Sequence, residues 1–406
     1  MKKLSIKSIY LILLVLFLAA FSMHVQAQED QREETPRRPA FFMRAPIVSP
    51  VINENNEVIF KLYAPEATKV TLSGNWMPGF GTNETLVKND TGLWMLNVGQ
   101  LKPEIYTYTM NVDGVRILDP GNRNIQRDGS RFESVVFIDG EASDLYKVKD
   151  VPHGTLSKVW YDSPVLDLKR RMYVYTPPGY ENGKEKYPVL YLLHGGGGDE
   201  DAWSTLGKSC QILDNLIHED KVMPMLVVMP NGNPGQSAAP GEGPVIPGKE
   251  LSQFDMGAMA SGKYEESLVK DIIPYIESNF RVHTGKANRA VSGLSMGGLQ
   301  TMNLAFRYPE VFDYFGVMSM GITERRPGGP DFFPDIEEKM ASLKNADYKL
   351  YWIGCGTDDF LYEAAKNLVA SMEKNELPYT YRESSGGHTW ANWRIYLSEL
   401  STLLFK

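Results

Sequence analysis

The amino-acid sequence predicts an α/β fold with a mainly parallel sheet covered by helices on both faces, preceded by a small all-β sandwich. Between Val48 and about Gly140, apolar and polar residues alternate in short runs, which is typical of antiparallel strands with one exposed face. After about Tyr146, compact apolar runs alternate with helical stretches, as in parallel sheets buried on both faces. We therefore assign residues 46–145 to the sandwich and residues 146–406 to the α/β part.

Turn residues separate the expected strands, and Asp113-Gly114 predicts a two-residue hairpin. A long stretch between Asn231 and Lys263 is rich in Gly, Pro, Ser and Ala, and a loop of that length is usually functional or mobile. The expected helices include Glu265–Phe280 and Phe360–Lys374, and the expected strands are Val58–Tyr63, Lys69–Leu72, Leu93–Val98, Tyr106–Val112, Val115–Leu118, Arg171–Tyr175, Val189–Leu193, Met225–Met229, Arg289–Ser292 and Lys349–Gly354.

The first 27 residues have the pattern of a secretory signal peptide. Three lysines precede an apolar run from Ile9 to Phe21, which is too short to span a bilayer, and small residues allow cleavage near Ala27. Residues 28–45 are rich in Gln, Glu, Arg and Pro and predict a flexible linker. We therefore expect a protein that is secreted or periplasmic.

Charge and composition exclude several classes of function. Loss of residues 1–27, which hold three Lys and no acidic residue, changes the formal net charge from −8 to −11. An acidic chain without basic runs is a poor partner for nucleic acid or an anionic membrane. No cluster has metal-ligand spacing and no phosphate loop or dinucleotide fingerprint occurs, so we expect no metal and no cofactor. Cys210 and Cys355 are either a disulfide or two free buried thiols.

The segment Gly293-Leu294-Ser295-Met296-Gly297 predicts a nucleophile. It follows a buried strand and precedes the helix-compatible run Gly298–Arg307, which is the strand–turn–helix setting of a nucleophile elbow. Such a sharp turn tolerates little more than hydrogen at positions 293 and 297, and it lifts the Ser295 hydroxyl out of the sheet. The alternative is a purely structural role, in which the segment is a tight strand–helix connection and Ser295 caps the helix.

A serine hydroxyl needs a base to take its proton. His388 lies in a Gly-rich loop before the last helix and is the expected base. The acid that orients the imidazole should lie between the two in the chain, after a strand. Asp358 and Asp359 both meet this condition, and one of them is expected to cap the following helix instead. Asp359 is the first choice and Asp358 the alternative.

Ester cleavage also needs N–H donors for the oxyanion of the tetrahedral intermediate. One is expected from the backbone of Met296, where the helix after the nucleophile begins. The other is expected from the glycine run at 195–198, with Gly196 as the best choice. His194 ends the preceding strand and should shape this loop. His194 and Trp203 are also candidates for the substrate-binding wall.

These residues together resemble carbohydrate esterase family 1, an esterase-D-like branch of the α/β-hydrolases. The resemblance implies an α/β-hydrolase fold, Ser295 as nucleophile, His388 as base and Asp359 as acid, with no cofactor. It covers most of residues 150–406 and rests on Arg171–Tyr180, Tyr187–Asp199, Trp203, Ile272–Phe280, Val291–Gly298, Cys355–Leu361 and Gly386–Trp393.

The sandwich of residues 46–145, called the front part from here on, is similar to immunoglobulin-like modules related to glycogen-binding domains. Trp76 and Trp94 could stack on a sugar, or they could be core residues of the sandwich. The similarity rests on Gly74–Trp76, Gly92–Trp94, Tyr106–Tyr108 and Asp113–Pro120.

The resemblance implies hydrolysis of carboxylic esters on plant cell-wall polysaccharide, with feruloyl esters of arabinoxylan as the first expectation. An acetyl xylan esterase is the closest alternative, followed by a siderophore esterase of the enterobactin type. An acyltransferase with the same triad and a non-catalytic carbohydrate-binding protein are alternatives from other classes. The expected partner is a feruloylated or acetylated xylan or xylo-oligosaccharide. The sequence leaves the oligomeric state open.

Overall fold

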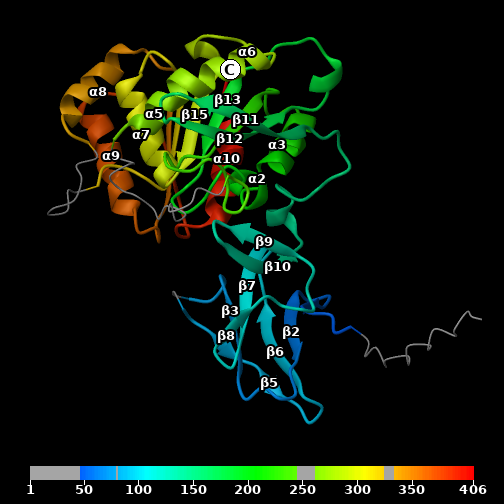
Figure 1. Ribbon diagram of the computed structural model, residues 1–406. Helices are drawn as coiled ribbons and strands as arrows, with labels where there is room; N and C mark the ends of the chain where they lie inside the picture. The colour runs from blue at the N-terminus through cyan, green and yellow to red at the C-terminus, as the bar shows by residue number, and fades with distance from the viewer. Residues whose placement is uncertain (1–45, 79–80, 245–260, 324–332) are drawn as a thin grey trace, which may run out of the picture. The chain divides into compact units, whose positions relative to one another are not determined.

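The computed structural model describes residues 46–78, 81–244, 261–323 and 333–406 (Figure 1). The expected signal peptide at 1–27 and linker at 28–45 lie outside the described residues, as does 245–260 of the long loop. Within the described ranges, no helix is both long enough and apolar enough to cross a membrane.

The front part consists of two antiparallel sheets, which is compatible with an immunoglobulin-like module. One has the order β1-β2-β6-β5 and the other the order β4-β3-β7-β10-β9, with β8 paired to β7. The expected hairpin at Asp113-Gly114 joins β7 to β8, and both of its residues have positive φ. The strands are β1 (Val51–Ile52), β2 (Glu57–Tyr63), β3 (Val70–Gly74), β4 (Glu84–Thr85), β5 (Val87–Lys88), β6 (Leu93–Gln100), β7 (Glu104–Val112), β8 (Val115–Ile117), β9 (Ile125–Asp128) and β10 (Arg131–Ile138).

Aromatic side chains fill the core of this part. In β2 the alternate residues are buried, as period-two patterning requires, and Phe60 lies in the core cluster. Trp76 stacks on Phe60 with ring centroids 5.6 Å apart. Trp94 is buried and its indole N–H donates to the carbonyl of Ala64. The structure thus favours packing roles for both tryptophans.

The α/β part is built on an eight-stranded sheet with the order β11-β12-β14-β13-β15-β16-β17-β18. The pairs β11–β12 and β12–β14 are antiparallel, and all pairs from β14 to β18 are parallel. This is the mainly parallel sheet that the sequence predicted. The strands are β11 (Thr155–Ser163), β12 (Leu168–Thr176), β13 (Val189–Leu193), β14 (Leu226–Pro230), β15 (Arg289–Leu294), β16 (Tyr314–Met318), β17 (Leu350–Gly356) and β18 (Thr380–Ser384).

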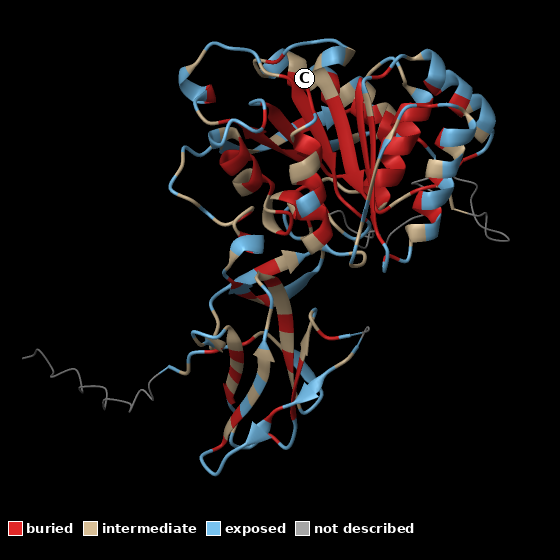
Figure 2. Ribbon diagram, turned by 180° about the vertical axis from the view of Figure 1, so that it is seen from behind, coloured by how far each residue is buried: buried red, intermediate tan, exposed pale blue. Residues whose placement is uncertain are grey.

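Helices cover both faces of this sheet, so its central strands are buried along their length (Figure 2). In β13, Leu190 and Leu192 pack with α2, α3 and α10, whereas Tyr191 and Leu193 pack with α5 to α9 on the other face. The helical stretch expected at 265–280 is α5, a π-helical turn and α6 in succession. The helices are α2 (Ala202–Thr205), α3 (Ser209–His218), α5 (Lys263–Ser267), the π-helix Leu268–Ile272, α6 (Ile273–Asn279), α7 (Met296–Arg307), α8 (Ile336–Asn345), α9 (Tyr362–Lys374) and α10 (Trp390–Ser401).

Buried contacts join the front part to the α/β part. Ile105 of β7 belongs to the same hydrophobic cluster as Tyr396 of α10. The neighbouring Glu104 accepts hydrogen bonds of 2.6 Å from the guanidinium of Arg394 and from the hydroxyl of Tyr146. Arg394 is only 2% exposed, so this carboxylate is the counter-ion of a buried cation.

The two cysteines are free thiols in the structure. Cys210 lies in α3 and Cys355 in β17. Burial raises the pKa of each thiol to about 12, so both are uncharged at neutral pH. Of the two possibilities left open by the sequence, the structure therefore shows the unpaired one.

We expect Asp119 to stabilise the front part. Its buried carboxylate accepts hydrogen bonds from the hydroxyls of Ser49 (2.6 Å) and Tyr108 (2.8 Å). Asp119→Ala leaves both hydroxyls without this acceptor and should lower the free energy of unfolding by about 2–4 kcal/mol, measured in urea. The control Asp139→Ala removes an exposed carboxylate and should cost less than about 0.5 kcal/mol. Equal losses in the two variants would contradict this role.

Candidate active site

Ser295 lies in the turn between β15 and α7. Its backbone has φ 52° and ψ −114°, a conformation that non-glycine residues rarely adopt. Hydrogen bonds hold it there: its N–H donates to the carbonyl of Met318, and its carbonyl accepts from the N–H of Leu299, both at 2.9 Å. The backbone therefore fixes where the hydroxyl-bearing residue stands at the end of the sheet.

Two glycines make this turn possible because backbone segments meet there. A methyl group at Gly293 would lie 2.4 Å from the carbonyl carbon of Gly297. A methyl group at Gly297 would lie 2.5 Å from the carbonyl oxygen of Leu193. Both distances are well inside van der Waals contact, so only glycine fits. The expectation that these positions tolerate little more than hydrogen is confirmed.

The structure brings His388 to Asp359. Nδ1 of the imidazole lies 3.0 Å from both carboxylate oxygens, and the Asp359 side chain is fully buried. Burial raises the pKa of this carboxyl, but hydrogen bonds from His388, the Leu361 amide and Ser319 lower it by more, so the net pKa is below its ordinary value. Asp359 is therefore charged at neutral pH and can accept a hydrogen bond from Nδ1–H of His388, the tautomer in which Nε2 carries the lone pair.

Asp358, the other acid that the sequence offered, is exposed. Its backbone N–H donates to the carbonyl of Gly386 and so ties the acid turn to the loop that carries His388. The side chain of Asn392 holds the same loop by donating to the carbonyls of Ser385 and Gly387. Asp359 is thus the partner of His388, but the expectation that the other acid caps the following helix is wrong, because the N-cap of α9 is Leu361 with no side-chain cap hydrogen bond.

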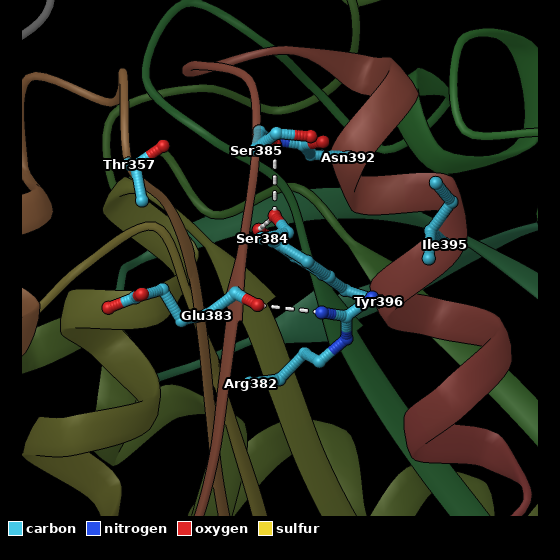
Figure 3. Close-up of a pocket in the computed structure, with 8 residues that line it drawn as sticks. All are labelled: Thr357, Arg382, Glu383, Ser384, Ser385, Asn392, Ile395 and Tyr396. Carbon is cyan, nitrogen blue, oxygen red and sulfur yellow. Dashed lines mark hydrogen bonds between the residues drawn. The ribbon is translucent and has the colours of Figure 1, made fainter.

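A polar pocket of about 480 Å³ borders this histidine loop. Figure 3 shows the residues that line it, which come from the turn directly after β17, from β18, from the segment after β18 and from α10. They include Ser384, Ser385 and Asn392. The hydroxyl of Ser384 lies 2.5 Å from that of Tyr396. None of the site residues expected from the sequence lines this pocket.

The glycine loop, defined here as Gly195–Gly198, follows β13 and lies beside the serine turn. A methyl group at Gly195 would be 3.4 Å from Cβ of Ser295, whereas Gly196 is exposed. On the other side, Met296 is the first residue of α7, so its N–H has no partner within the helix. The two donors expected from the sequence thus belong to segments that meet at Ser295.

His194 and Trp203 are each 1% exposed. The Nδ1–H of His194 donates to the carbonyl of Gly195 (2.8 Å), and its Nε2 accepts from the N–H of Gly232 (2.7 Å). Trp203 donates to the carbonyl of Leu193. His194 supports the glycine loop from inside and Trp203 holds the end of β13, so the expectation that they contact substrate gains no support from the structure. The expectation that His194 shapes the loop agrees with these contacts.

Two features of the site were missed by the sequence reasoning. Phe360 is 74% exposed and its ring centroid lies 4.4 Å from that of His388, so it presents an aromatic surface beside the imidazole. Its position directly after the two acids was the available signal. Glu200 is buried after the glycine loop and accepts from Arg171 and Asn231. This buried network fixes the segment that follows the loop, and no local pattern indicated it.

Within the described residues, no group of three or more His, Cys, Asp or Glu side chains could hold a metal ion. The site offers chemical features of its own. It has a strained serine, a hydrogen-bonded imidazole–carboxylate pair and a helix N-terminus.

The mainly parallel sheet with an antiparallel start, the helices on both faces and the serine elbow after β15 define the α/β-hydrolase fold. Residues 163–403 match the protein family described as "Putative esterase", and the chain belongs to this family.

The chain is similar to several curated esterases. It is 30% identical over 364 residues to an endo-1,4-beta-xylanase/feruloyl esterase of Xylanibacter ruminicola, which covers 88% of the chain and 46% of the relative. It is 28% identical over 239 residues to an esterase of Mycobacterium tuberculosis, which covers 57% of the chain and 45% of that protein. The chain thus spans about half the length of these relatives.

Solved structures extend the comparison. A ferulic acid esterase of carbohydrate esterase family 1 from Anaeromyces mucronatus has a TM-score of 0.55 at 25% identity, covering 64% of this chain and 95% of that one. The enterobactin esterase of Shigella flexneri has a TM-score of 0.62 at 15% identity, covering 86% and 94%, and shows the fold alone. The expected fold class and the resemblance to carbohydrate esterase family 1 are confirmed.

We expect His194 to make stability depend on pH. Burial lowers its pKa, so the folded protein holds it neutral. As the pH falls below 6.5, the ordinary value, the unfolded chain takes up the proton first. This contribution to stability is therefore complete above that pH and is lost below it, at up to about 1.4 kcal/mol per pH unit.

The measurement is urea unfolding of wild type and His194→Gln between about pH 5 and pH 8. The variant should lose this part of the slope, whereas His218→Gln, at an exposed histidine, should keep it. An identical slope in wild type and His194→Gln would contradict the prediction.

Proposed function

We propose that this protein is a secreted serine esterase that hydrolyses carboxylic esters on plant cell-wall polysaccharide, with feruloyl esters of arabinoxylan as its preferred substrates. The observation that carries the proposal is the His388–Asp359 pair, hydrogen-bonded at 3.0 Å, in a fold whose elbow carries Ser295. The similarity to an endo-1,4-beta-xylanase/feruloyl esterase supports the choice of substrate.

In the first half of the proposed reaction, Oγ of Ser295 attacks the acyl carbonyl carbon while Nε2 of His388 takes the hydroxyl proton. The carbonyl oxygen becomes negative and accepts hydrogen bonds from the N–H groups of Met296 and Gly196. The buried carboxylate of Asp359 stabilises the imidazolium. His388 then gives its proton to the sugar oxygen as the ester C–O bond breaks, and the acyl group stays on Ser295.

In the second half, water attacks the acyl carbon while His388 takes one of its protons. The tetrahedral intermediate again uses the two backbone donors. Oγ of Ser295 leaves and recovers its proton from His388, and the carboxylic acid departs. Every proton removed by the imidazole is returned, so the cycle needs no cofactor.

The position of Phe360 favours a substrate with an aromatic acyl group. Its exposed ring lies against the imidazole that must reach the ester, so a flat phenolic ring bound beside the scissile bond could pack on it. Acetyl is too small to use such a surface. The proposal of a secreted or periplasmic location, with a signal peptide cleaved near Ala27, rests on the pattern of residues 1–27.

We expect the two neighbouring acids to differ sharply in their effect on turnover. Asp359→Asn cannot hold the Nδ1–H tautomer of His388 and should lower kcat by about 10⁴-fold. The matched control Asp358→Asn alters an exposed side chain and should stay within about threefold of wild type. The measurement is steady-state hydrolysis of an aryl ester by each variant. Similar losses in both would overturn the assignment of Asp359.

We expect methyl ferulate to be turned over faster than acetylated xylan and enterobactin at equal enzyme concentration. Phe360→Ala should weaken the preference by raising KM for methyl ferulate more than for an acetyl ester. Ser295→Ala is the control and should lose activity on every substrate by several powers of ten. Equal turnover of the three substrates would refute the feruloyl assignment, and unchanged hydrolysis by Ser295→Ala would refute the serine mechanism.

A further inference from the structure

The front part reaches the glycine loop through one arginine. Arg127 lies in β9, and its guanidinium forms two hydrogen bonds with the carboxylate of Asp199, from Nη1 at 2.5 Å and from Nη2 at 2.9 Å. Nη2 also donates to Asp201 at 2.6 Å. Asp199 directly follows Gly198 in the chain, so the fork of Arg127 holds the end of the glycine loop.

These charges lie out of the solvent. The side chains of Arg127, Asp199 and Asp201 are 14%, 2% and 18% exposed. Removing the arginine leaves the carboxylates of Asp199 and Asp201 uncompensated, and movement of the loop toward solvent would relieve this. Asp199 also stands next to the segment that is to stabilise an oxyanion, so its negative charge needs a counter-ion nearby.

The turn after β9 touches the loop itself. Nη1 of Arg127 donates to the carbonyl of Gly129 at 2.6 Å. A methyl group at Gly129 would lie 2.2 Å from the carbonyl oxygen of Gly197, so the two backbones are in direct contact. The arginine thus fixes both the turn that presses on the loop and the acid that ends it.

The ends of the glycine loop are also held from within the α/β part. His194 donates to the carbonyl of Gly195, and the side chain of Asn233 donates to the carbonyl of Gly198 at 3.0 Å. The exposed tip at Gly196 and Gly197 lies between these two attachments. The front part contacts this tip, where the proposed oxyanion donor stands.

We propose that Arg127 is a positioning residue for ester hydrolysis, which acts through Asp199 and the Gly129–Gly197 contact to hold the N–H of Gly196 toward the oxyanion. The front part is then a structural component of the active site. This inference rests on the proposed function of the site.

The test compares kcat and KM of Arg127→Ala, Arg127→Lys and the control Arg116→Ala on an aryl ester. A misplaced oxyanion donor weakens the transition state more than the bound substrate, so Arg127→Ala should lower kcat by about 10- to 100-fold and change KM by less than about threefold. Arg127→Lys keeps the charge but cannot form the two parallel hydrogen bonds, so its kcat should lie between those of wild type and Arg127→Ala. Arg116 pairs with Glu133 on the same part of the chain, away from the loop, so Arg116→Ala should match wild type.

Coupling to Asp199 is tested with a double variant. If Arg127 acts in part through this acid, the loss of kcat in Arg127→Ala combined with Asp199→Asn should be smaller than the product of the two single losses. Asp201→Asn, one step farther from the loop, should lose less than Asp199→Asn. Multiplicative losses in the double variant would overturn the proposed route through Asp199.

Thermal unfolding and near-ultraviolet circular dichroism establish that each variant is folded. If Arg127→Ala does not fold, Arg127→Lys decides: a lowered kcat with unchanged KM supports the proposal, and wild-type kinetics overturns it. In a folded Arg127→Ala, unchanged kcat, or a loss confined to KM, would also overturn it.

The rate at which a fluorophosphonate labels Ser295 separates this inference from the proposed function. In labelling, Oγ of Ser295 bonds to phosphorus and fluoride leaves, while the phosphonyl oxygen of the reagent gains negative charge and uses the same donors; no particular ester is required. Wild type that is labelled but hydrolyses no aryl ester would refute the esterase proposal, while about tenfold slower labelling of Arg127→Ala would still support the positioning role. Equal labelling rates would refute the positioning role alone, and an unlabelled, inactive wild type would refute both.

Discussion

The contact between Gly297 and the carbonyl oxygens of Leu193 and His194 is the constraint on which the candidate site depends. It sets the first turn of α7 directly against the end of β13, the neighbour of β15 in the sheet. The start of a helix and the glycine loop therefore meet at one point, and Ser295 is forced into its strained backbone conformation with positive φ between them. Any side chain at position 297 would separate the helix from the strand and so move both proposed oxyanion donors at once.

The sequence predicted those parts of the fold and site that leave a local trace. An elbow requires glycines at fixed offsets from the serine, and a strand buried on both faces is a continuous apolar run, so Ser295 and strands such as β13 could be recognised from short segments. The expected order of serine, acid and histidine located His388 and narrowed the acid to two neighbours. The choice between Asp358 and Asp359 depends on how the chain turns after β17. The local sequence fits either acid, and only the position of the loop that carries His388 decides between them.

Other features depend on packing between distant segments. The edge strands β11 and β18 carry many polar residues and were not expected, because an edge strand needs no continuous apolar run. Trp203 was a candidate for the substrate-binding wall but lies in the core. Phe360, predicted only as the start of a helix, is an exposed aromatic beside His388. Arg127 and Asp199 are 72 residues apart, and no local pattern links a strand arginine of one part to the acid after a loop of another.

The ion pairs of Glu104 and Arg127 cross between the two parts in opposite directions: the front part supplies an anion to the buried Arg394 and a cation to the buried Asp199. Stabilising ion pairs therefore cross the boundary near residue 145 that the sequence pattern indicates, so the two parts stabilise each other. Recombination that exchanged the front part for an unrelated sandwich would leave the buried Arg394 and the buried Asp199 of the α/β part without their counter-ions. The two parts are then expected to be inherited, and to melt, as a single cooperative unit rather than as interchangeable modules.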